Sequence, residues 1–180
     1  MGLGAICGVC VSSLSCFNDE RGSLLRLLDN SYIEDDLDPF QVSYTLLSRN
    51  PTKGTLRGMH YQEAPHAERK FISCLSGAIF LVIFDPRSES DSFLMSESTT
   101  LTAADQKGIH VPAGLALGWM TLESDTDIHY SIQGTFNASA SRGLRFDDPI
   151  LGLAWPDTPQ LVSDKDLQWP AFDATEPGSE

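Results

Sequence analysis

The sequence predicts an all-β fold, either a sandwich or a barrel. Short runs of β-branched, aromatic and other apolar residues recur along the chain, and Gly, Pro, Asn, Asp and Ser separate them. The run Ala78–Phe84 is apolar at every position, which is typical of a strand that is buried on both faces. Residues 127–132 alternate instead, so Ile128, Tyr130 and Ile132 should face the core while the residues between them face away.

The strands are expected in regular succession along one domain. They are residues 5–11, 40–47, 71–75, 78–84, 98–101, 109–112, 119–122 and 128–132. Helix is expected only in short pieces, at residues 24–28 and near residues 163–167. A length of 180 residues suits one domain with one sizeable core, which we place at residues 1–172. The polar residues 173–180 are expected to fray.

The net charge of −13 narrows the possible partners of this protein. An acidic chain repels phosphate backbones, so we expect no nucleic-acid binding, although a few basic side chains could line a pocket for a small anion. No stretch reaches the ~20 apolar residues that span a bilayer, so we expect no membrane association. The apolar N-terminus has no Lys or Arg before Arg21, which argues against a secretory signal and favours a cytoplasmic protein.

The sequence carries only parts of two ligand motifs that commonly bind metal ions. Cys7 and Cys10 have the spacing of half a zinc site, but no second Cys/His pair follows, so we expect both to be small apolar residues of a first strand. Metal-binding double-stranded β-barrels often carry His-x-His and a later Pro-x-Gly-x-x-His. Here His60 is not part of a His-x-His pair, and Leu117 stands where the last histidine would be. We therefore expect a protein without a metal or an organic cofactor.

Four side chains together could move a proton at a carbon next to a carbonyl group. They are His60, Lys70, Tyr130 and Asp166. Histidine is the usual general base near neutral pH, and a lysine can stabilise a developing oxyanion. A tyrosine hydroxyl can act as an acid, and a carboxylate can orient an imidazole. Each also has an ordinary structural interpretation: a hydrogen-bonded histidine, a snorkelling lysine, a core tyrosine and a solvated aspartate.

The order of several short motifs resembles the dTDP-4-dehydrorhamnose 3,5-epimerase family, over most of the chain. The motifs are residues 19–22 (Asp-Glu-Arg-Gly), 56–62 (Leu-Arg-Gly-Met-His-Tyr-Gln), 85–87 (Asp-Pro-Arg), 111–114 (Val-Pro-Ala-Gly), 146–149 (Phe-Asp-Asp-Pro), 152–156 (Gly-Leu-Ala-Trp-Pro) and 163–166 (Ser-Asp-Lys-Asp). The resemblance implies a cupin-like jelly roll, also called a double-stranded β-helix, with a short helical C-terminal segment.

The resemblance also implies roles for particular residues. His60 would be the base, and Asp166 would orient it. Lys70 would stabilise an enolate, and Tyr130 would be the acid on the opposite face of the sugar. The expected substrate-binding residues are Arg21, Arg57, Gln62, Leu117 and Lys165.

The chain departs from the family mainly at positions that contact the substrate. Leu117 replaces a histidine of the family's Phe-Ala-His-Gly segment, and Leu81 replaces an aspartate. A family glutamate falls on Arg26, and the Gln-x-Asn segment has no clear counterpart at residues 42–47. A tyrosine that stacks on the nucleotide falls near Phe136, which keeps an aromatic face. We therefore expect a substrate or a stereochemical outcome that differs from that of a typical 3,5-epimerase.

Two functions remain open at this point. The first is cofactor-free epimerisation of a nucleotide-linked 4-keto-6-deoxy sugar at C3, at C5 or at both, in deoxysugar biosynthesis. The second is a cupin-like module that binds a sugar nucleotide without turnover. The resemblance further implies a homodimer, in which an apolar N-terminal edge strand is shared and Arg21 reaches the neighbouring subunit's pocket. The sequence does not identify the base or the sugar.

Overall fold

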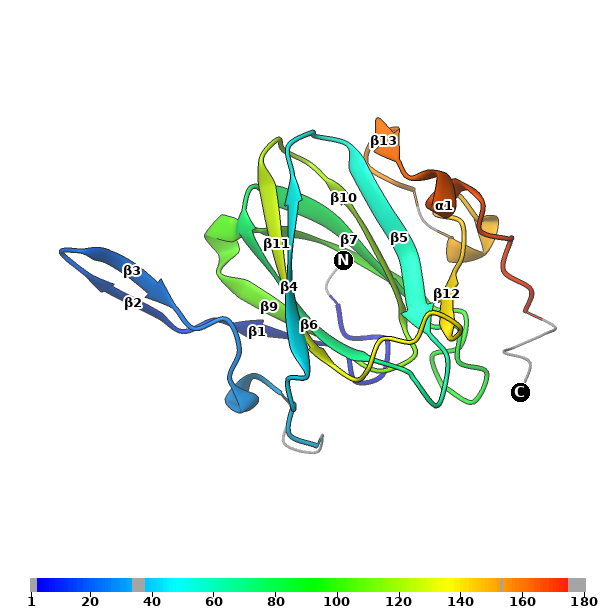
Figure 1. The fold of residues 1–180 in the computed structure, drawn as a ribbon, viewed down its shortest axis with the longest axis horizontal. Coiled ribbons are helices and arrows are strands. Elements are labelled where there is room, and N and C mark those ends of the chain that lie inside the picture. The colour runs from blue at the N-terminus through cyan, green and yellow to red at the C-terminus, as the bar shows by residue number, and fades with distance from the viewer. Residues whose placement is uncertain (1–2, 34–37, 153, 175–180) are drawn as a thin grey trace.

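Two antiparallel β-sheets face each other in the computed structural model of this chain, which describes residues 3–33, 38–152 and 154–174 (Figure 1). The first sheet, here called the β6 sheet, contains β1 (Cys10–Ser13), β9 (Lys107–Val111), β6 (Arg69–Ser76), β11 (Thr126–Gln133) and β4 (Tyr44–Asn50). The second, the β5 sheet, contains β12 (Ser141–Gly143), β5 (Thr55–Gln62), β10 (Ala116–Thr121), β7 (Ala78–Phe84) and β8 (Ser96–Thr102), with β13 (Leu161–Val162) parallel to β5.

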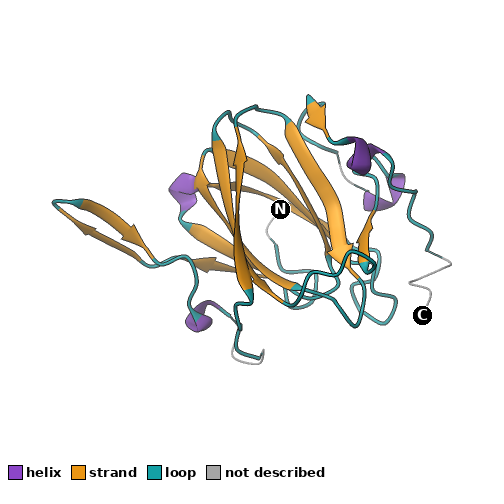
Figure 2. Ribbon diagram, in the orientation of Figure 1, coloured by secondary structure: helices purple, strands orange, loops and turns teal. Residues whose placement is uncertain are grey.

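This arrangement confirms the predicted all-β jelly roll (Figure 2). Strand β7 coincides with the predicted apolar run and is buried on both faces. Leu81 and Ile83 pack between the two sheets, while Val82 and Phe84 pack under the C-terminal part of the chain. Full burial of such a side chain contributes about 1.5–3 kcal/mol to stability. Strand β7 is therefore a main anchor of the β5 sheet.

In the part of the chain that the structure describes, helix occurs only as single turns. They are η1 (Asn30–Tyr32), η2 (Ala103–Asp105), η3 (Pro149–Leu151) and α1 (Asp164–Leu167). The last of these confirms the short helix that was predicted near residues 163–167. Among the described residues, no helix is long and apolar enough to cross a bilayer. Phe172 still packs edge-on against Phe84, and most of the tail that was expected to fray, residues 175–180, lies outside the described part.

The predicted helix at residues 24–28 is wrong. Residues 24 and 25 belong to β3 (Gly22–Leu25), which forms with β2 (Cys16–Asp19) a hairpin that projects from the body of the molecule, and residues 26–28 follow as a loop (Figure 1). The turn explains the difference. The Asp19 carboxylate accepts a hydrogen bond from the Arg21 backbone nitrogen at 2.8 Å, and Gly22 has a φ of 127°, which favours glycine.

The first strand also begins later than predicted, at Cys10 rather than at residue 5. The Glu97 carboxylate accepts hydrogen bonds from the backbone nitrogens of Gly4 and Ala5, at 3.0 and 2.6 Å. These bonds hold the N-terminal residues in a loop, because their donors are no longer available to a strand. Cys7 consequently lies in this loop and not in a first strand, as had been expected.

Strand β5 was not predicted from the sequence, because Gly58 interrupts the run of strand-forming residues there. Glycine is required there by the close approach of a neighbouring strand: a Cβ at Gly58 would lie 2.5 Å from the Cα of Gly118 on β10. The register of β10 against β5 shifts at this contact, between Leu117 and Trp119. The irregularity lies beside His60, so it shapes the part of β5 that was expected to carry chemistry.

Acid should destabilise this fold through His110, which is 1% exposed. Its Nδ1 lies 3.0 Å from the Gly8 carbonyl and its Nε2 accepts from Arg69 at 3.2 Å, so the ring is neutral. Burial, together with the Arg69 charge, lowers the pKa of His110 to about 4. The unfolded chain therefore binds the extra proton first, and about 3 kcal/mol of stability is lost as the pH falls from 6.5 to 4.

Urea unfolding of the wild type and of His110→Gln at pH 7 and at pH 4.5 measures this loss. The variant lacks the titrating ring, so its stability should change less between the two pH values. An equal change in both proteins would contradict the assignment to His110.

Candidate active site

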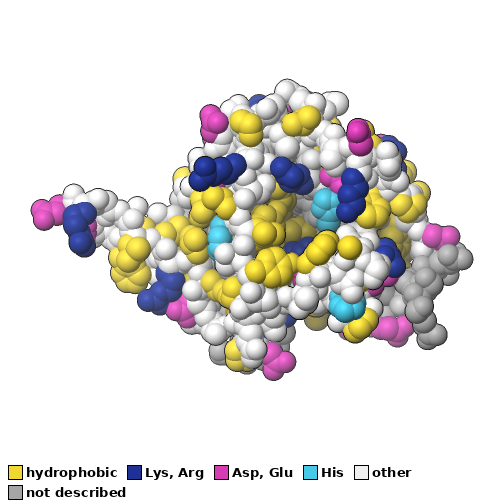
Figure 3. Space-filling model, viewed as in Figure 1, with side chains coloured by type: hydrophobic (Ala, Val, Ile, Leu, Met, Phe, Trp, Pro, Cys, Tyr) yellow, Lys and Arg dark blue, Asp and Glu magenta, His cyan; other side chains and the backbone are white. Residues whose placement is uncertain are grey.

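A pocket of about 670 Å³ opens between the two sheets. Its walls come from β4, β6 and β11 on one side and from β5, β10 and α1 on the other. Figure 3 shows a hollow on this face, with apolar side chains inside it and basic side chains near its rim. Pockets of roughly 300–1,000 Å³ with a few converging polar groups are typical of small-molecule sites.

His60 and Asp166 form the central polar pair of the pocket. Nε2 of His60 lies 2.5 Å from Oδ1 of Asp166, whose side chain is 5% exposed. Burial alone would raise the pKa of Asp166, but hydrogen bonds from His60 and from the Gly58 backbone outweigh burial and lower that pKa. An ionised carboxylate only accepts hydrogen bonds, so Nε2 donates to Asp166, and in the neutral ring the lone pair is on Nδ1. In that tautomer His60 has a basic nitrogen.

The C-terminal segment brings Asp166 to β5. Ser163 caps α1 by accepting a hydrogen bond from the Asp166 backbone nitrogen at 3.1 Å, and the indole nitrogen of Trp169 donates to the Asp166 carboxylate at 3.3 Å. The Trp169 ring lies edge-on to His60, with centroids 6.3 Å apart. Gly143 on β12 leaves room for this ring, because a Cβ there would collide with it. Asp166 is therefore held from both its backbone and its side chain.

Lys70 faces the pocket from β6, on the opposite sheet from His60, and pairs with Ile132 of β11. Burial lowers the pKa of Lys70, and the nearby Glu68 carboxylate opposes this effect. Glu68 is itself buried and accepts a hydrogen bond from the Tyr44 hydroxyl at 2.6 Å. Burial and this carboxylate raise the pKa of Tyr44, so its hydroxyl stays protonated.

Tyr130 faces the same pocket from β11, on the apolar face on which the sequence had placed it. Its hydroxyl oxygen accepts a hydrogen bond from the indole nitrogen of Trp119. Burial raises the pKa of Tyr130 to about 12, while the Trp119 bond and the Arg57 charge act in the opposite direction. The Tyr130 hydroxyl is therefore protonated at neutral pH, as an acid must be.

Besides Arg49, whose guanidinium lies 3.9 Å from the Asp127 carboxylate, three basic side chains line the pocket. They are Arg57, Lys70 and Lys165. In the part of the chain that the structure describes, none of them lies within ion-pair distance of an Asp or Glu. Arg57 donates to the Asn50 side chain at 3.3 Å, and Nζ of Lys165 lies 5.1 Å from the Trp169 ring centre. In a chain with a net charge of −13, this concentration of unpaired cations favours an anionic ligand.

Gln62 lies in the pocket wall, but its side-chain amide is hydrogen-bonded to other residues of the protein. The nitrogen donates to the carbonyls of His66 and Thr135, at 2.9 and 3.3 Å. The oxygen accepts from the Asn137 backbone nitrogen at 2.7 Å. Gln62 therefore holds the loop that carries Phe136, a second pocket residue.

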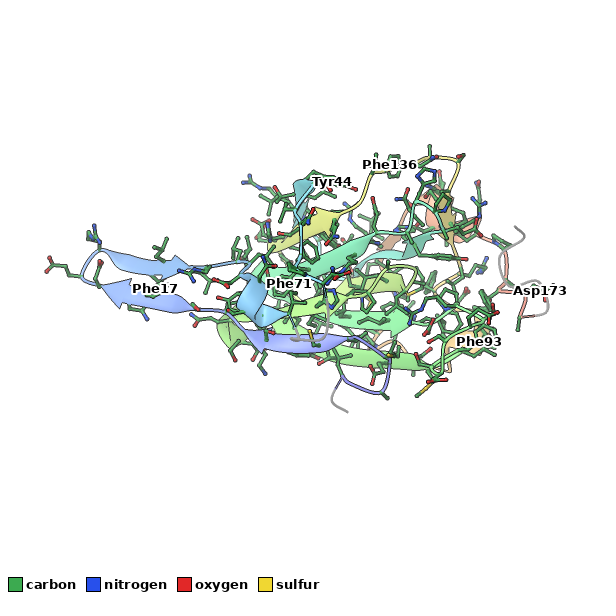
Figure 4. All side chains as sticks on the ribbon, turned by 90° about the horizontal axis from the view of Figure 1, so that it is seen from below. Phe17, Tyr44, Phe71, Phe93, Phe136 and Asp173 are labelled. Carbon is green, nitrogen blue, oxygen red and sulfur yellow. The ribbon has the colours of Figure 1, made fainter. Side chains whose placement is uncertain are left out.

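Leu117 and Phe136 give the pocket apolar surfaces. Leu117 of β10 is directly opposite His60 of β5 and is 5% exposed, so the wall beside the candidate base is apolar. Phe136 is 62% exposed, which leaves its ring available to a ligand. Figure 4 places Phe136 and Tyr44 on the same side of the molecule, and both residues line the pocket.

Arg21, unlike the other predicted site residues, lies away from the pocket of its own subunit. It lies in the turn of the projecting hairpin, where its guanidinium pairs with Asp19 at 2.5 Å and its side chain is 86% exposed. The hairpin extends away from the two sheets (Figure 1). The remaining predicted residues converge on one pocket from both sheets and from α1.

Sequence reasoning missed several residues that shape this site. They are Tyr44, Glu68, Trp119 and Trp169. Two of them had a usable signal: Trp169 follows Asp166 by three residues, and Trp119 shares a strand face with Leu117. Glu68 had none, because only the fold shows that the residue before Arg69 is buried beside Lys70. A cluster of three or more His, Cys, Asp or Glu side chains that could hold a metal ion does not occur among the described residues.

The fold and the site together define a jelly-roll protein whose pocket combines a His–Asp pair with a lysine and a tyrosine from the facing sheet. The model of the dTDP-4-dehydrorhamnose 3,5-epimerase family matches residues 4–174. The chain belongs to this family.

Known relatives agree with this assignment. A dTDP-4-dehydrorhamnose 3,5-epimerase of Sinorhizobium fredii is 40% identical over 157 residues, which cover 87% of this chain and 80% of the relative. The structure of such an epimerase from Bacillus anthracis, with TDP and PPi bound, has a TM-score of 0.85 at 29% identity and covers 91% and 94% of the two chains. ChmJ, a 3'-monoepimerase from Streptomyces bikiniensis in complex with dTDP-quinovose, has a TM-score of 0.86 at 27% identity, with 95% and 87% covered.

Asp166→Asn should destabilise the fold at pH 7. The change removes the ionised acceptor for His60, Trp169 and the Gly58 backbone, and a hydrogen bond to a charged group contributes about 1.5–3 kcal/mol. Asp164→Asn is the matched control, because Asp164 lies exposed in the same helical turn. Urea unfolding should show a loss for Asp166→Asn and a change within about 0.5 kcal/mol for the control. Equal stabilities of the two variants would refute this role of Asp166.

Proposed function

We propose that this enzyme epimerises a nucleotide-linked 4-keto-6-deoxy sugar at C3, C5 or both, by removing a proton next to the ketone and returning one to the opposite face. One observation carries the proposal. A basic nitrogen of His60 on the β5 sheet and a protonated hydroxyl of Tyr130 on the β6 sheet line one pocket, with Lys70 beside Tyr130. A planar enolate between the sheets would present one face to each.

The first step transfers the carbon-bound proton to Nδ1 of His60. Asp166 favours this step because its carboxylate holds Nε2–H and stabilises the imidazolium that forms. The electron pair moves to the ketone oxygen, which becomes an enolate. The Lys70 ammonium stabilises this negative charge, and a buried position strengthens that interaction because little water screens it.

The second step delivers the Tyr130 proton to the other face of the same carbon. The enolate collapses to the ketone with inverted configuration, and Tyr130 is left as a phenolate. The nearby Arg57 guanidinium favours this charged form of Tyr130. Tyr130 then regains a proton from solvent and His60 releases one, so no redox partner is consumed. Positioned acids and bases of this kind contribute typically about 10²–10⁴-fold each.

The unpaired cations support a diphosphate-linked substrate. Arg57 and Lys165 lie at the pocket and lack carboxylate partners among the described residues, and Phe136 offers an exposed ring for stacking on a base. We assign the nucleotide diphosphate to these side chains. The apolar Leu117 beside His60 supports a sugar, or an inverted carbon, other than that of a typical 3,5-epimerase.

The alternative is a module that binds a sugar nucleotide without turnover. Binding alone has no need for a carboxylate that sets the tautomer of His60, or for an acid on the facing sheet. Epimerisation accounts for both features. The four cysteines suit a reducing compartment, and we propose the cytoplasm.

The His60→Ala variant should lose solvent exchange while keeping its fold. Wild type and variant are incubated in deuterated water with a panel of 4-keto-6-deoxy nucleotide sugars, beginning with dTDP-4-keto-6-deoxyglucose, and C3–H and C5–H are followed by NMR. Loss of the base should slow exchange by roughly 10²–10⁴-fold. His66→Ala is the control, since His66 lies outside the pocket lining. Wild-type exchange in a folded His60→Ala protein would remove His60 from the mechanism.

We also propose that the protein is a homodimer in which Arg21 serves the neighbouring subunit's pocket. The projecting hairpin supports this, because Phe17 and Leu24 on it are 54% and 70% exposed. Apolar side chains on a projecting hairpin are stabilised when another surface covers them.

Mixed dimers test the proposal. Arg21→Ala and His60→Ala are each expected to be weakly active as pure proteins. In the mixed dimer, the subunit with intact His60 would receive an intact Arg21 from its partner, so activity should be restored in one pocket of two. An absence of restoration in exchanged dimers, or a monomer by light scattering at micromolar concentration, would contradict the proposal.

A further inference from the structure

Trp119 has a polar contact that its place in the core does not require. It lies on β10, is 2% exposed and packs in the cluster between the two sheets. A phenylalanine would fill most of the same space. The indole nitrogen instead crosses between the sheets and donates to the hydroxyl oxygen of Tyr130 on β11.

The direction of this hydrogen bond fixes where the Tyr130 proton points. An indole N–H can only donate, so the phenol oxygen must accept. The phenol hydrogen is then directed away from Trp119. No acceptor for it occurs among the described residues, and Tyr130 lines the pocket. The hydroxyl is therefore left as a donor toward whatever occupies the pocket.

A second contact places a cation on the same indole. The guanidinium carbon of Arg57 lies 6.0 Å from the Trp119 ring centre, and Arg57 is held by the Asn50 side chain at 3.3 Å. A positive charge near the indole favours negative charge on the oxygen to which the N–H donates. The arrangement therefore stabilises the phenolate that Tyr130 becomes after giving up its proton.

We propose that Trp119 is a positioning residue that holds Tyr130 as the proton donor and stabilises its phenolate, and so sets how often an enolate is inverted rather than returned. This rests on the proposed epimerase function. Protonation by His60 restores the starting sugar with solvent deuterium, whereas protonation by Tyr130 gives the epimer. Trp119 acts only on the second route, so it controls the ratio of inversion to exchange.

Trp119→Phe tests this, because it keeps an aromatic ring and removes the N–H. In deuterated water, with whichever 4-keto nucleotide sugar the wild type converts, inversion should slow roughly tenfold while deuterium exchange into unreacted substrate persists, since a hydrogen bond to a charged group is lost. Trp155→Phe is the matched control: it also removes an indole hydrogen bond, to the Phe146 carbonyl at 2.7 Å, outside the pocket. An unchanged ratio of inversion to exchange in folded Trp119→Phe would overturn the proposal.

A double-variant cycle separates positioning from packing. If Trp119 acts through Tyr130, adding Trp119→Phe to Tyr130→Phe should slow the residual reaction no further. An equal fall in both backgrounds would mean that Trp119 only supports the core. A wild type that neither exchanges nor inverts any sugar of the panel would instead defeat the proposed function itself.

One measurement does not depend on the folding of a Trp119 variant. The protein has three tryptophans, so wild-type NMR spectra contain three indole N–H signals. Tyr130→Phe removes the acceptor of Trp119 alone, so one signal should move upfield and the other two should stay. Three unchanged signals would show that Trp119 makes no such bond, and the proposal would fail.

Discussion

The hydrogen bond between His60 and Asp166 connects two parts of the chain that are far apart in sequence, and the pocket depends on it. Asp166 lies in a single helical turn that is too short to be stable alone. Its position comes from the Ser163 cap, from Trp169 and from the space above Gly143. The C-terminal segment thus holds Asp166 beside His60 and also covers the outer face of the β5 sheet.

The candidate catalytic side chains are divided between the two sheets. The β5 sheet carries His60, and the β6 sheet carries Lys70 and Tyr130. The separation of the sheets is set by a well-packed core that includes Leu81, Trp119 and Ile128, so the distance across the pocket is fixed by packing and not by flexible loops. A base and an acid held on opposite walls suit a reaction in which a planar intermediate must be approached from both faces.

The sequence was sufficient for the fold class and for much of the site, for different reasons. Strand β7 and the alternation of β11 followed from hydrophobic pattern alone, because burial on one or two faces determines composition. The second strand of the hairpin was mistaken for the start of a helix, since its two adjacent leucines show no strand alternation, and Leu24 is exposed while Leu25 is half-buried. Strand β5 was missed because its geometry depends on contact between Gly58 and Gly118, which are sixty residues apart.

The residues that surround the candidate catalytic side chains were harder to predict from the sequence than those side chains themselves. Motif order was enough to nominate His60, Lys70, Tyr130 and Asp166, and the structure places all four at one pocket. The contacts that tune them were not visible. The burial of Glu68, two residues before Lys70, and the contact of Trp119 with Tyr130 across the two sheets both depend on how the sheets pack, which no local pattern encodes.

The most direct test of opposed proton transfer is the origin of the hydrogen at the inverted carbon. A single turnover of the wild type in deuterated water, analysed by NMR and mass spectrometry, reports it. Opposed transfer places solvent deuterium at that carbon in every inverted molecule, because His60 removes one proton and Tyr130 supplies another from the other face. Retention of the original hydrogen at the inverted carbon would mean that a single group moves the proton, and would rule out opposed transfer by His60 and Tyr130.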